Sequence, residues 1–125
     1  MATWDELSID SRSAAQVLLA QGHTRSSISR AYFAAYAAAT ARVAARVSLP
    51  AGRQNPTHAD LRRYVGSSLT NLPLWQRQWL GTLIRRLWKM RVDADYVPGA
   101  CVDDRLAKQA LRDVGAILRE LGVGT

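Results

Sequence analysis

Apolar side chains recur at intervals of three and four residues along most of the chain, the spacing of helices that bury one face. No segment shows the alternation of apolar and polar residues typical of a half-exposed strand. Capping residues, glycines and prolines divide the pattern into five helices. We expect these helices at about residues 4–21, 24–47, 56–65, 73–96 and 103–121. The sequence therefore predicts an all-α fold, an up-and-down helical bundle in which residues 1–125 form a single domain.

Residues that favour helix ends mark these boundaries. Thr3 with Glu6 makes a capping-box pattern, and Thr24 is placed to cap the second helix. Asn55 followed by Pro56 suits the start of the third helix. Stop signals follow at Gly22, Gly66, Pro98 and Gly122. The segment 48–57 is rich in Pro, Gly, Asn and Ser, which predicts a loop.

Helical spacing also predicts which faces are buried. The first helix is expected to bury Leu7, Ala14, Val17, Leu18 and Gln21. The second is expected to bury Ile28, Tyr32, Ala35, Tyr36, Ala39 and Val43. The many alanines of the second helix allow its neighbours to approach closely.

The fourth helix is apolar over an arc of roughly 220°, against about 100° for a helix with one buried face. The arc holds Trp75, Trp79, Leu80, Leu83, Ile84, Leu87, Trp88 and Met90. Either this helix runs through the centre of the bundle, or its second flank meets another subunit. We favour the second account, a homodimer with this helix at the interface.

Arg91 interrupts the apolar arc. With each residue advancing by about 100°, it falls between Ile84 and Leu87 on the helix. An unpaired buried charge is costly. We therefore expect Arg91 either to pair with Asp95, one turn further on, or to line a site that anionic ligands enter.

The charge is concentrated in the middle of the chain. The formal net charge is +7, yet residues 25–91 hold twelve Lys or Arg and a single acid, Asp60, which gives 12 − 1 = +11. A basic field of this kind attracts polyanions such as nucleic acids. The alternative is a solvated basic surface without a specific partner.

Several classes of protein are disfavoured. One cysteine, Cys101, allows no internal disulfide, and two histidines with a lone cysteine make a zinc site improbable. No apolar run approaches the length of a membrane span, and the N-terminus lacks a signal-peptide pattern. We expect a cytoplasmic protein that uses no metal or other cofactor.

Three segments resemble a known family. SRAYFAAYAAATA at 29–41, NPTHADLRRYV at 55–65 and RVDADY at 91–96 are similar, in that order, to parts of small prokaryotic HEPN-domain proteins. The first matches their Ala-rich second helix with its aromatic pair, Tyr32 and Phe33. The second resembles their short third helix with its histidine, and the third resembles their Arg-x-x-Ala-Asp-Tyr signature.

The resemblance implies a helical bundle that dimerises through the helices bearing the arginine motif. Many members are metal-independent ribonucleases, including toxins encoded beside a nucleotidyltransferase antitoxin. Others are accessory or nucleotide-binding modules. In active members a histidine typically follows the arginine after four to six residues. Here Tyr96 occupies the first of those positions, and no histidine lies in range.

Four residues are candidates for catalysis, because metal-free RNA cleavage needs a base, an acid and a cation. Arg91 suits the cation, and Asp95 is the carboxylate that would orient it. Tyr96 could donate a proton or orient phosphate, or simply pack on the bundle. His58 has the ordinary pKa for proton transfer, although a capping or surface role in the first turn of its helix is the more ordinary reading.

Other residues are candidates for holding RNA. The basic side chains that could contact phosphates are Arg85, Arg86, Lys89, Arg62 and Arg63. A solvated helix face would explain them equally well. Trp75, Trp79 and Trp88 could stack on bases, although tryptophans at helical spacing are more often part of a core or an interface.

Two hypotheses follow. The first is an RNA-binding, metal-independent endoribonuclease of a toxin–antitoxin or defence system, held in check by a nucleotidyltransferase-type antitoxin. The second is a non-catalytic HEPN interaction or nucleotide-binding module that partners a nucleotidyltransferase. The basic middle segment favours the first, and the missing histidine favours the second.

Overall fold

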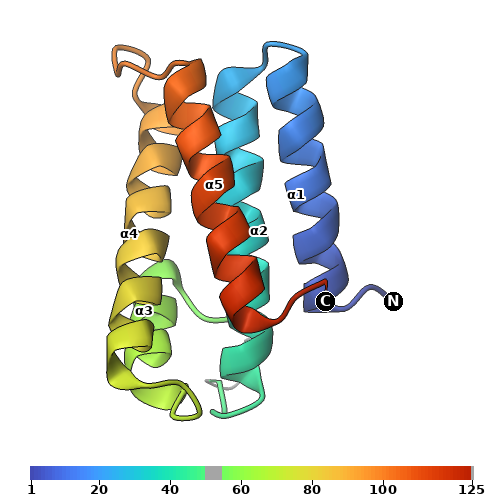
Figure 1. Cartoon of the computed structure of the whole chain (residues 1–125). Coiled ribbons are helices and arrows are strands. Elements are labelled where there is room, and N and C mark those ends of the chain that lie inside the picture. The colour runs from blue at the N-terminus through green and yellow to red at the C-terminus, as the bar shows by residue number, and fades with distance from the viewer. Residues whose placement is uncertain (50–54, 125) are drawn as a thin grey trace.

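The computed structural model describes residues 1–49 and 55–124, and within them every regular element is a helix (Figure 1). The five helices are α1 Trp4–Ala20, α2 Thr24–Ala44, α3 His58–Ser68, α4 Leu74–Tyr96 and α5 Asp104–Leu121. Successive long helices run in opposite directions, with the short α3 beside α4. The predicted all-α, up-and-down bundle of five helices is confirmed. No helix in the described part is both long and apolar enough to cross a membrane.

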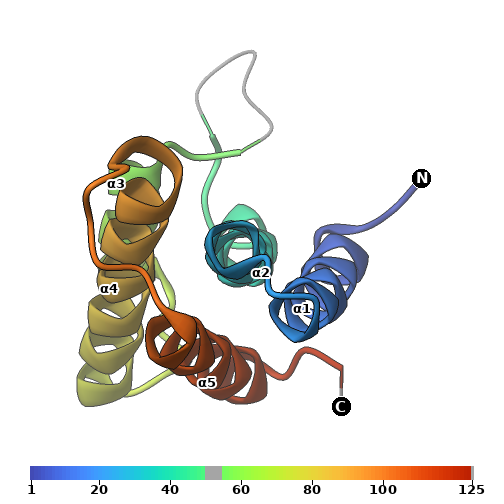
Figure 2. The same cartoon turned by 90° about the horizontal axis from the view of Figure 1, so that it is seen from above.

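The second helix lies at the centre of the bundle and contacts each of the other four (Figure 2). Its predicted inner face is confirmed, since all six residues are buried. Ala31, Ala34, Ala37 and Ala38 are buried as well, so the helix is covered on nearly every side. A helix that is apolar around its circumference suits such a position.

The inner face predicted for α1 is wrong. Its buried residues are Ser8, Ser11 and Ala15, whereas Val17 is 55% exposed. The Ser8 hydroxyl donates to the carbonyl oxygen of Ala34 at 2.6 Å, which satisfies a buried polar group. Small side chains thus form the buried face of α1, and hydroxyl groups of Ser8 and Ser27 donate to backbone carbonyls across the contact with α2.

Two helix starts also differ from expectation. Thr24 is the first residue of α2 rather than its cap, and its hydroxyl donates to Asp104 at 2.9 Å. The third helix starts at His58, because Thr57 is its N-cap and accepts from the Asp60 amide at 3.1 Å. The expected cap, Asn55, therefore lies outside the helix.

Helix ends were predicted unevenly. The second helix ends at Ala44, three residues before the expected end, and α3 continues through Gly66 to Ser68. Both ends of α5 are confirmed, with Asp103 as N-cap and Gly122 in the left-handed conformation at φ 75°. Within the expected loop at 48–57, residues 50–54 lie outside the described residues.

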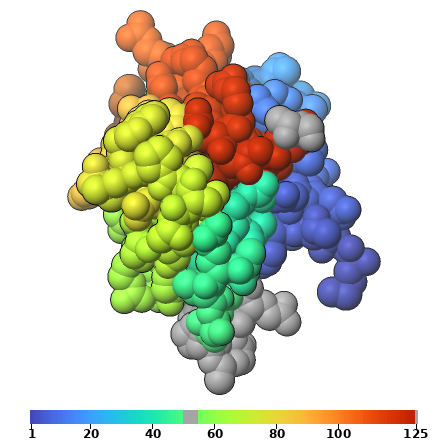
Figure 3. Space-filling view, turned by 60° about the horizontal axis from the view of Figure 1, so that its bottom comes forward, coloured from blue at the N-terminus to red at the C-terminus, as the bar shows by residue number. Residues whose placement is uncertain are grey.

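The apolar arc of α4 is used mostly inside the bundle. This helix contacts α2, α3 and α5, and its buried apolar residues are Leu80, Leu83, Ile84, Leu87, Met90 and Ala94. Most of the arc is therefore used as the first of the two accounts expected, by packing against several helices of the same chain. Apart from Tyr96 at its end, the large exposed hydrophobic side chains of α4 lie at its start, where Trp75 is 68% and Trp79 37% exposed. Figure 3 brings this end of the bundle forward and shows the start of α4 on the surface.

Candidate functional site

Two adjoining hollows lie where α2, the start of α3 and the last turns of α4 meet. One has a volume of about 280 Å³ and is lined by Ser29, Arg30, Tyr32, Phe33, His58 and Arg91. The other, of about 400 Å³, is lined by Phe33, Tyr36, Asn55, Pro56, Thr57, His58 and Arg91. Phe33, His58 and Arg91 line both. We call the two together the Arg91 hollow.

Arg91 both forms an ion pair and lines the hollow, so the two expectations for it hold together. Its Nε donates to Oδ2 of Asp95 at 2.9 Å, and the Ser29 hydroxyl donates to the same oxygen at 3.1 Å. The guanidinium lies 5.2 Å from the centre of the Trp88 ring. Asp95 and Trp88 thus hold the arginine by its Nε and by one face, an arrangement that suits recognition of an anion by the terminal nitrogens.

His58 is packed among aromatic rings, so the expected surface role is wrong. Its ring stacks on Trp88 at 4.1 Å with an interplanar angle of 24°, and the Tyr36 ring is 5.3 Å away. Its Nδ1 shares a hydrogen bond with the hydroxyl of Tyr32. Thr57 caps the helix, and the His58 ring packs on Trp88 and Tyr36 instead.

The protonation states around His58 follow from burial. Burial lowers the pKa of His58, and the nearby charge of Arg91 lowers it further. Burial also raises the pKa of Tyr32, with Tyr36 adding to the effect. At neutral pH the pair therefore consists of a neutral imidazole and a protonated phenol.

The hydrogen bond between Tyr32 and His58 can be formed in two ways. The hydroxyl can donate to Nδ1, or the Nδ1–H group can donate to the hydroxyl oxygen. Only the second tautomer leaves Nε2 able to accept a proton. In that tautomer Tyr32 orients the ring, and His58 can act as a base in the Arg91 hollow.

Tyr96 lies at the edge of the site, where α4 ends. Its ring centre is 5.7 Å from the Arg91 guanidinium, and the residue is 67% exposed. It is not a helix-end aromatic packed on the bundle, which was one of the two expectations. Arg91, Asp95 and His58 are brought together at the hollow, and Tyr96 borders the outer side of the arginine.

Arg25 secures the end of α4, a role that the sequence analysis missed. Arg25 lies on α2, and its guanidinium donates five hydrogen bonds of 3.0–3.1 Å to backbone carbonyls in the last turn of α4 and just after that helix. The acceptors are Asp93, Ala94, Val97, Pro98 and Ala100. The Asp93 and Val97 carbonyls also accept from the Val97 and Ala100 amides, so Arg25 adds to the backbone hydrogen bonds at the end of the helix. The side chain thereby fixes the turn that carries Asp95 and Tyr96.

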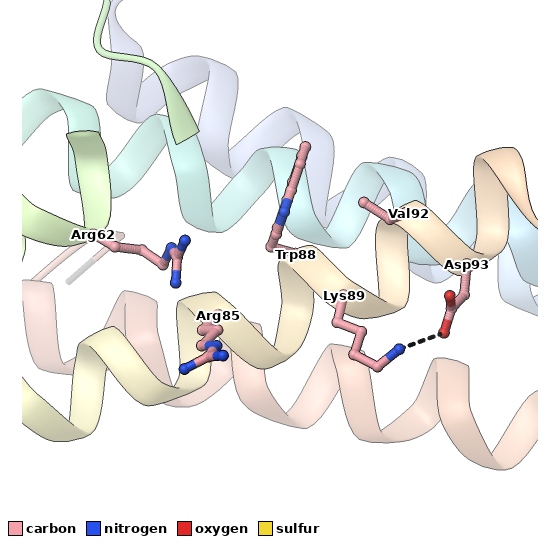
Figure 4. A pocket seen from close by; sticks show the side chains of 6 residues that line it. All are labelled: Arg62, Arg85, Trp88, Lys89, Val92 and Asp93. Carbon is pink, nitrogen blue, oxygen red and sulfur yellow. Dashed lines mark ion pairs between the residues drawn. The ribbon is translucent and has the colours of Figure 1, made fainter. Parts of the chain in front are cut away.

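Three of the five predicted RNA-binding residues surround a separate hollow of about 350 Å³ (Figure 4). It is lined by Arg62, Arg85, Trp88, Lys89, Val92 and Asp93, and we call it the basic hollow. Lys89 lies 3.6 Å from Asp93. The basic hollow adjoins the Arg91 hollow through Trp88, which lines the former and stacks on His58 of the latter.

The other two predicted RNA-binding residues lie elsewhere. Arg86 donates two hydrogen bonds, of 2.8 and 2.6 Å, to Asp113 of α5, which is only 4% exposed. Arg63 is exposed and pairs with Asp60 at 3.2 Å on the outside of α3. Adjacent helical residues point about 100° apart, so neither Arg85 and Arg86 nor Arg62 and Arg63 share a face.

Tyr32 was not identified from the sequence as a site residue; it was expected in the core and as one of the family's aromatic pair. Trp88 was named as a residue that could stack on bases, although a place in the core or at an interface was favoured, and its ring stacks on His58. The available signal for Tyr32 was its hydroxyl, because a tyrosine on a buried face needs a polar partner. His58, on the next helix, is the partner in the structure.

Comparison with known proteins gives one result. The family model described as HEPN domain matches residues 1–123. No curated protein and no solved structure matches the chain. All three segments on which the resemblance was based lie within the matched range, and they contribute residues to the Arg91 hollow from α2, α3 and α4.

Proposed function

The chain belongs to the HEPN-domain family, and from this premise we propose that it binds RNA and cleaves it without a metal ion. The observation that carries the proposal is that Arg91 and His58 line the same hollow although 32 other residues separate them in sequence. Active relatives are expected to take arginine and histidine from one motif. Here His58 of α3 supplies the imidazole that the RVDADY motif lacks.

The proposed reaction uses the 2′-hydroxyl of the RNA as nucleophile. His58 accepts its proton through Nε2 while the 2′-oxygen attacks the adjacent phosphorus. The terminal nitrogens of Arg91 stabilise the charge that develops on the phosphoryl oxygens. The bond from phosphorus to the 5′-oxygen breaks, and that oxygen takes a proton from the Tyr96 hydroxyl. The products are a 2′,3′-cyclic phosphate and a 5′-hydroxyl.

The surroundings of His58 support a base at neutral pH. The lowered pKa keeps the imidazole neutral to lower pH than is usual for histidine. Tyr32 holds the ring through Nδ1, as the base in many hydrolases is oriented by a third group. Asp95 has the corresponding role for Arg91.

The test is cleavage of RNA by the purified protein in the presence of EDTA. Wild type should cleave, and Arg91→Ala should lose cleavage while remaining folded. Arg63→Ala is the matched control, because it removes an arginine that lies outside both hollows. A folded wild type that leaves RNA intact contradicts the proposal.

A second candidate function is a non-catalytic module that binds a nucleotide or a nucleotidyltransferase partner. The observation that favours it is the position of Tyr96, which is exposed beside an arginine already paired with Asp95. On this account Arg91 and Asp95 brace α4. A wild type without ribonuclease activity, together with unfolding of Arg91→Ala, would support this function over the first.

We also propose that the chain forms a homodimer and that a nucleotidyltransferase-type antitoxin controls it. The support for the dimer is the family together with the exposed apolar start of α4, where Leu74 is 56% exposed beside Trp75 and Trp79. Trp75→Glu should weaken association in light scattering. Ile84 is unsuitable for this test, because it is buried in the bundle and a charge there would disrupt the core.

A further inference from the structure

The basic hollow gathers three positive side chains from two helices around one space. Arg62 comes from α3, and Arg85 and Lys89 come from α4. Figure 4 shows Arg62 extending from α3 toward α4, above Arg85. Asp93 is the one acid among the six lining residues, and it lies beside Lys89. The lining therefore carries a net charge of 3 − 1 = +2.

One nitrogen of the Arg62 side chain lacks a hydrogen-bond acceptor among the described residues. Its Nε is buried and has no hydrogen-bond partner in the part of the chain that the structure describes. A buried donor without a partner is uncommon and costs free energy. Like charges that converge on one hollow also repel one another. An anion held among these side chains would offset this repulsion.

Trp88 indicates which part of a nucleotide the basic hollow would take. Its ring already stacks on His58 and lies beneath the Arg91 guanidinium. The hollow thus offers positive charge rather than an uncovered ring face. Arginine guanidinium groups match the geometry of phosphate, and two of them meet here.

We propose that the basic hollow binds a phosphate of single-stranded RNA next to the phosphate held at Arg91, so that one strand passes Trp88 and contacts both hollows. This inference rests on the proposed RNA-binding function and extends it to a second phosphate site. The Trp88 side chain separates the two hollows. We therefore assign them to successive phosphates of an oligonucleotide, which a nucleoside separates, rather than to the directly linked phosphates of a free nucleotide.

The experiment measures binding without cleavage. Fluorescently labelled RNAs of one, two, four and eight nucleotides are fully 2′-O-methylated, which blocks the attacking hydroxyl and keeps the phosphates. Wild type is compared with Arg62→Gln/Arg85→Gln. The control is Arg105→Gln/Lys108→Gln, which removes the same charge from exposed positions of α5 that line neither hollow. Circular dichroism establishes that each variant is folded.

For the octanucleotide, the hollow variant should bind at least about tenfold more weakly than the control variant. The slope of log affinity against log salt should become shallower by about 0.7, because the contact with one phosphate is lost. The single nucleotide should bind both variants alike. Affinity of the wild type should rise most sharply between one and two nucleotides.

Equal loss of octanucleotide affinity in both variants would overturn the inference, because it would reveal a general effect of charge. Loss of single-nucleotide binding in the hollow variant would also overturn it, in favour of a free nucleotide as ligand. The outcome is separate from that of the cleavage test. A wild type that fails to cleave RNA but shows the predicted binding pattern rejects the ribonuclease and retains the second phosphate site.

Discussion

Arg86 and Arg91 lie on the same helix, little more than one turn apart, yet their surroundings differ. On the α5 side, Arg86 is held by both oxygens of the buried Asp113, which also accepts from Gln109 at 2.8 Å. On the α2 and α3 side, Asp95 engages Arg91 through Nε alone, and the guanidinium borders a hollow. Around Arg86, both oxygens of the Asp113 carboxylate are used by partners within the fold. Around Arg91, the terminal guanidinium nitrogens remain available to donate to a ligand.

The comparison shows how an arginine that stabilises the fold differs from an arginine that can bind a ligand. Both residues carry the same charge and lie on the same helix, so neither property distinguishes them. They are distinguished by how completely the polar partners are used within the bundle. We expect substitutions on the α5 side to change stability, and substitutions on the α2 and α3 side to change activity.

The largest expected effect separates the two arginines by their activity. Arg91→Ala should lower kcat/KM for RNA at least about a hundredfold, because the developing charge loses its cation. Arg86→Ala should stay within about threefold of wild type at a temperature where it is folded, since that change acts on the bundle and not on the hollow. Cleavage rates in EDTA measure both. Equal losses in the two variants would remove the distinction.

The next prediction concerns stability, for which the partner of Arg86 should matter more than the partner of Arg91. Asp113→Asn should lower the free energy of unfolding by about 2 kcal/mol, since the neutral amide lacks the charge and has only one oxygen to accept the two Arg86 hydrogen bonds, while the half-exposed Arg86 regains water. Asp95→Asn should cost about 1 kcal/mol or less. Urea denaturation measures the two values. A greater cost at Asp95 would mean that the supposed site is the more important brace.

A smaller effect is expected at Arg25. Arg25→Ala should destabilise the protein by about 1 kcal/mol, because its hydrogen bonds are partly exposed and water replaces them. The local effect should be greater, with faster amide hydrogen exchange at residues 97–100 than elsewhere in the bundle. Arg25→Lys should restore only part of the protection, because an ammonium cannot reach as many carbonyls. Uniformly faster exchange would indicate a general loss of stability instead.

The smallest effect is the contribution of His58 to the pH dependence of stability. Its pKa is lower in the folded protein than the ordinary value of 6.5, so the unfolded chain binds the proton more readily. Stability should therefore fall as the pH drops through about 6.5 toward the folded pKa. His58→Gln should flatten this part of the curve in urea denaturation followed from pH 7.5 to 5. An unchanged curve would mean that the histidine is not desolvated.

Local signals explain why some elements were predicted well. Asp103 and Gly122 define α5 because a cap and a left-handed glycine act on their own neighbours. Arg91 and Asp95 could be paired from their spacing of four residues. The face of α1 could not be predicted, because Ser8 is buried through a hydrogen bond to α2 that no periodicity records.

The missed parts of the site depend on contacts between residues distant in sequence. In the sequence, His58 looks like an ordinary residue of a first helical turn. Only the fold shows that Tyr32 of α2 forms a hydrogen bond with it. Arg25 and Arg86 could not be distinguished by composition from the other arginines. Their partners, the end of α4 and Asp113, lie 68–75 and 27 residues away along the chain.

The central claim is that the Arg91 hollow promotes attack by the 2′-hydroxyl without a metal ion. Analysis of the product ends by mass spectrometry, after incubation of RNA with the wild-type protein in EDTA, tests this claim most directly. The account predicts fragments that end in a 2′,3′-cyclic phosphate and begin with a 5′-hydroxyl. Intact RNA, or cleavage that needs a divalent cation and leaves 5′-phosphates, would contradict it.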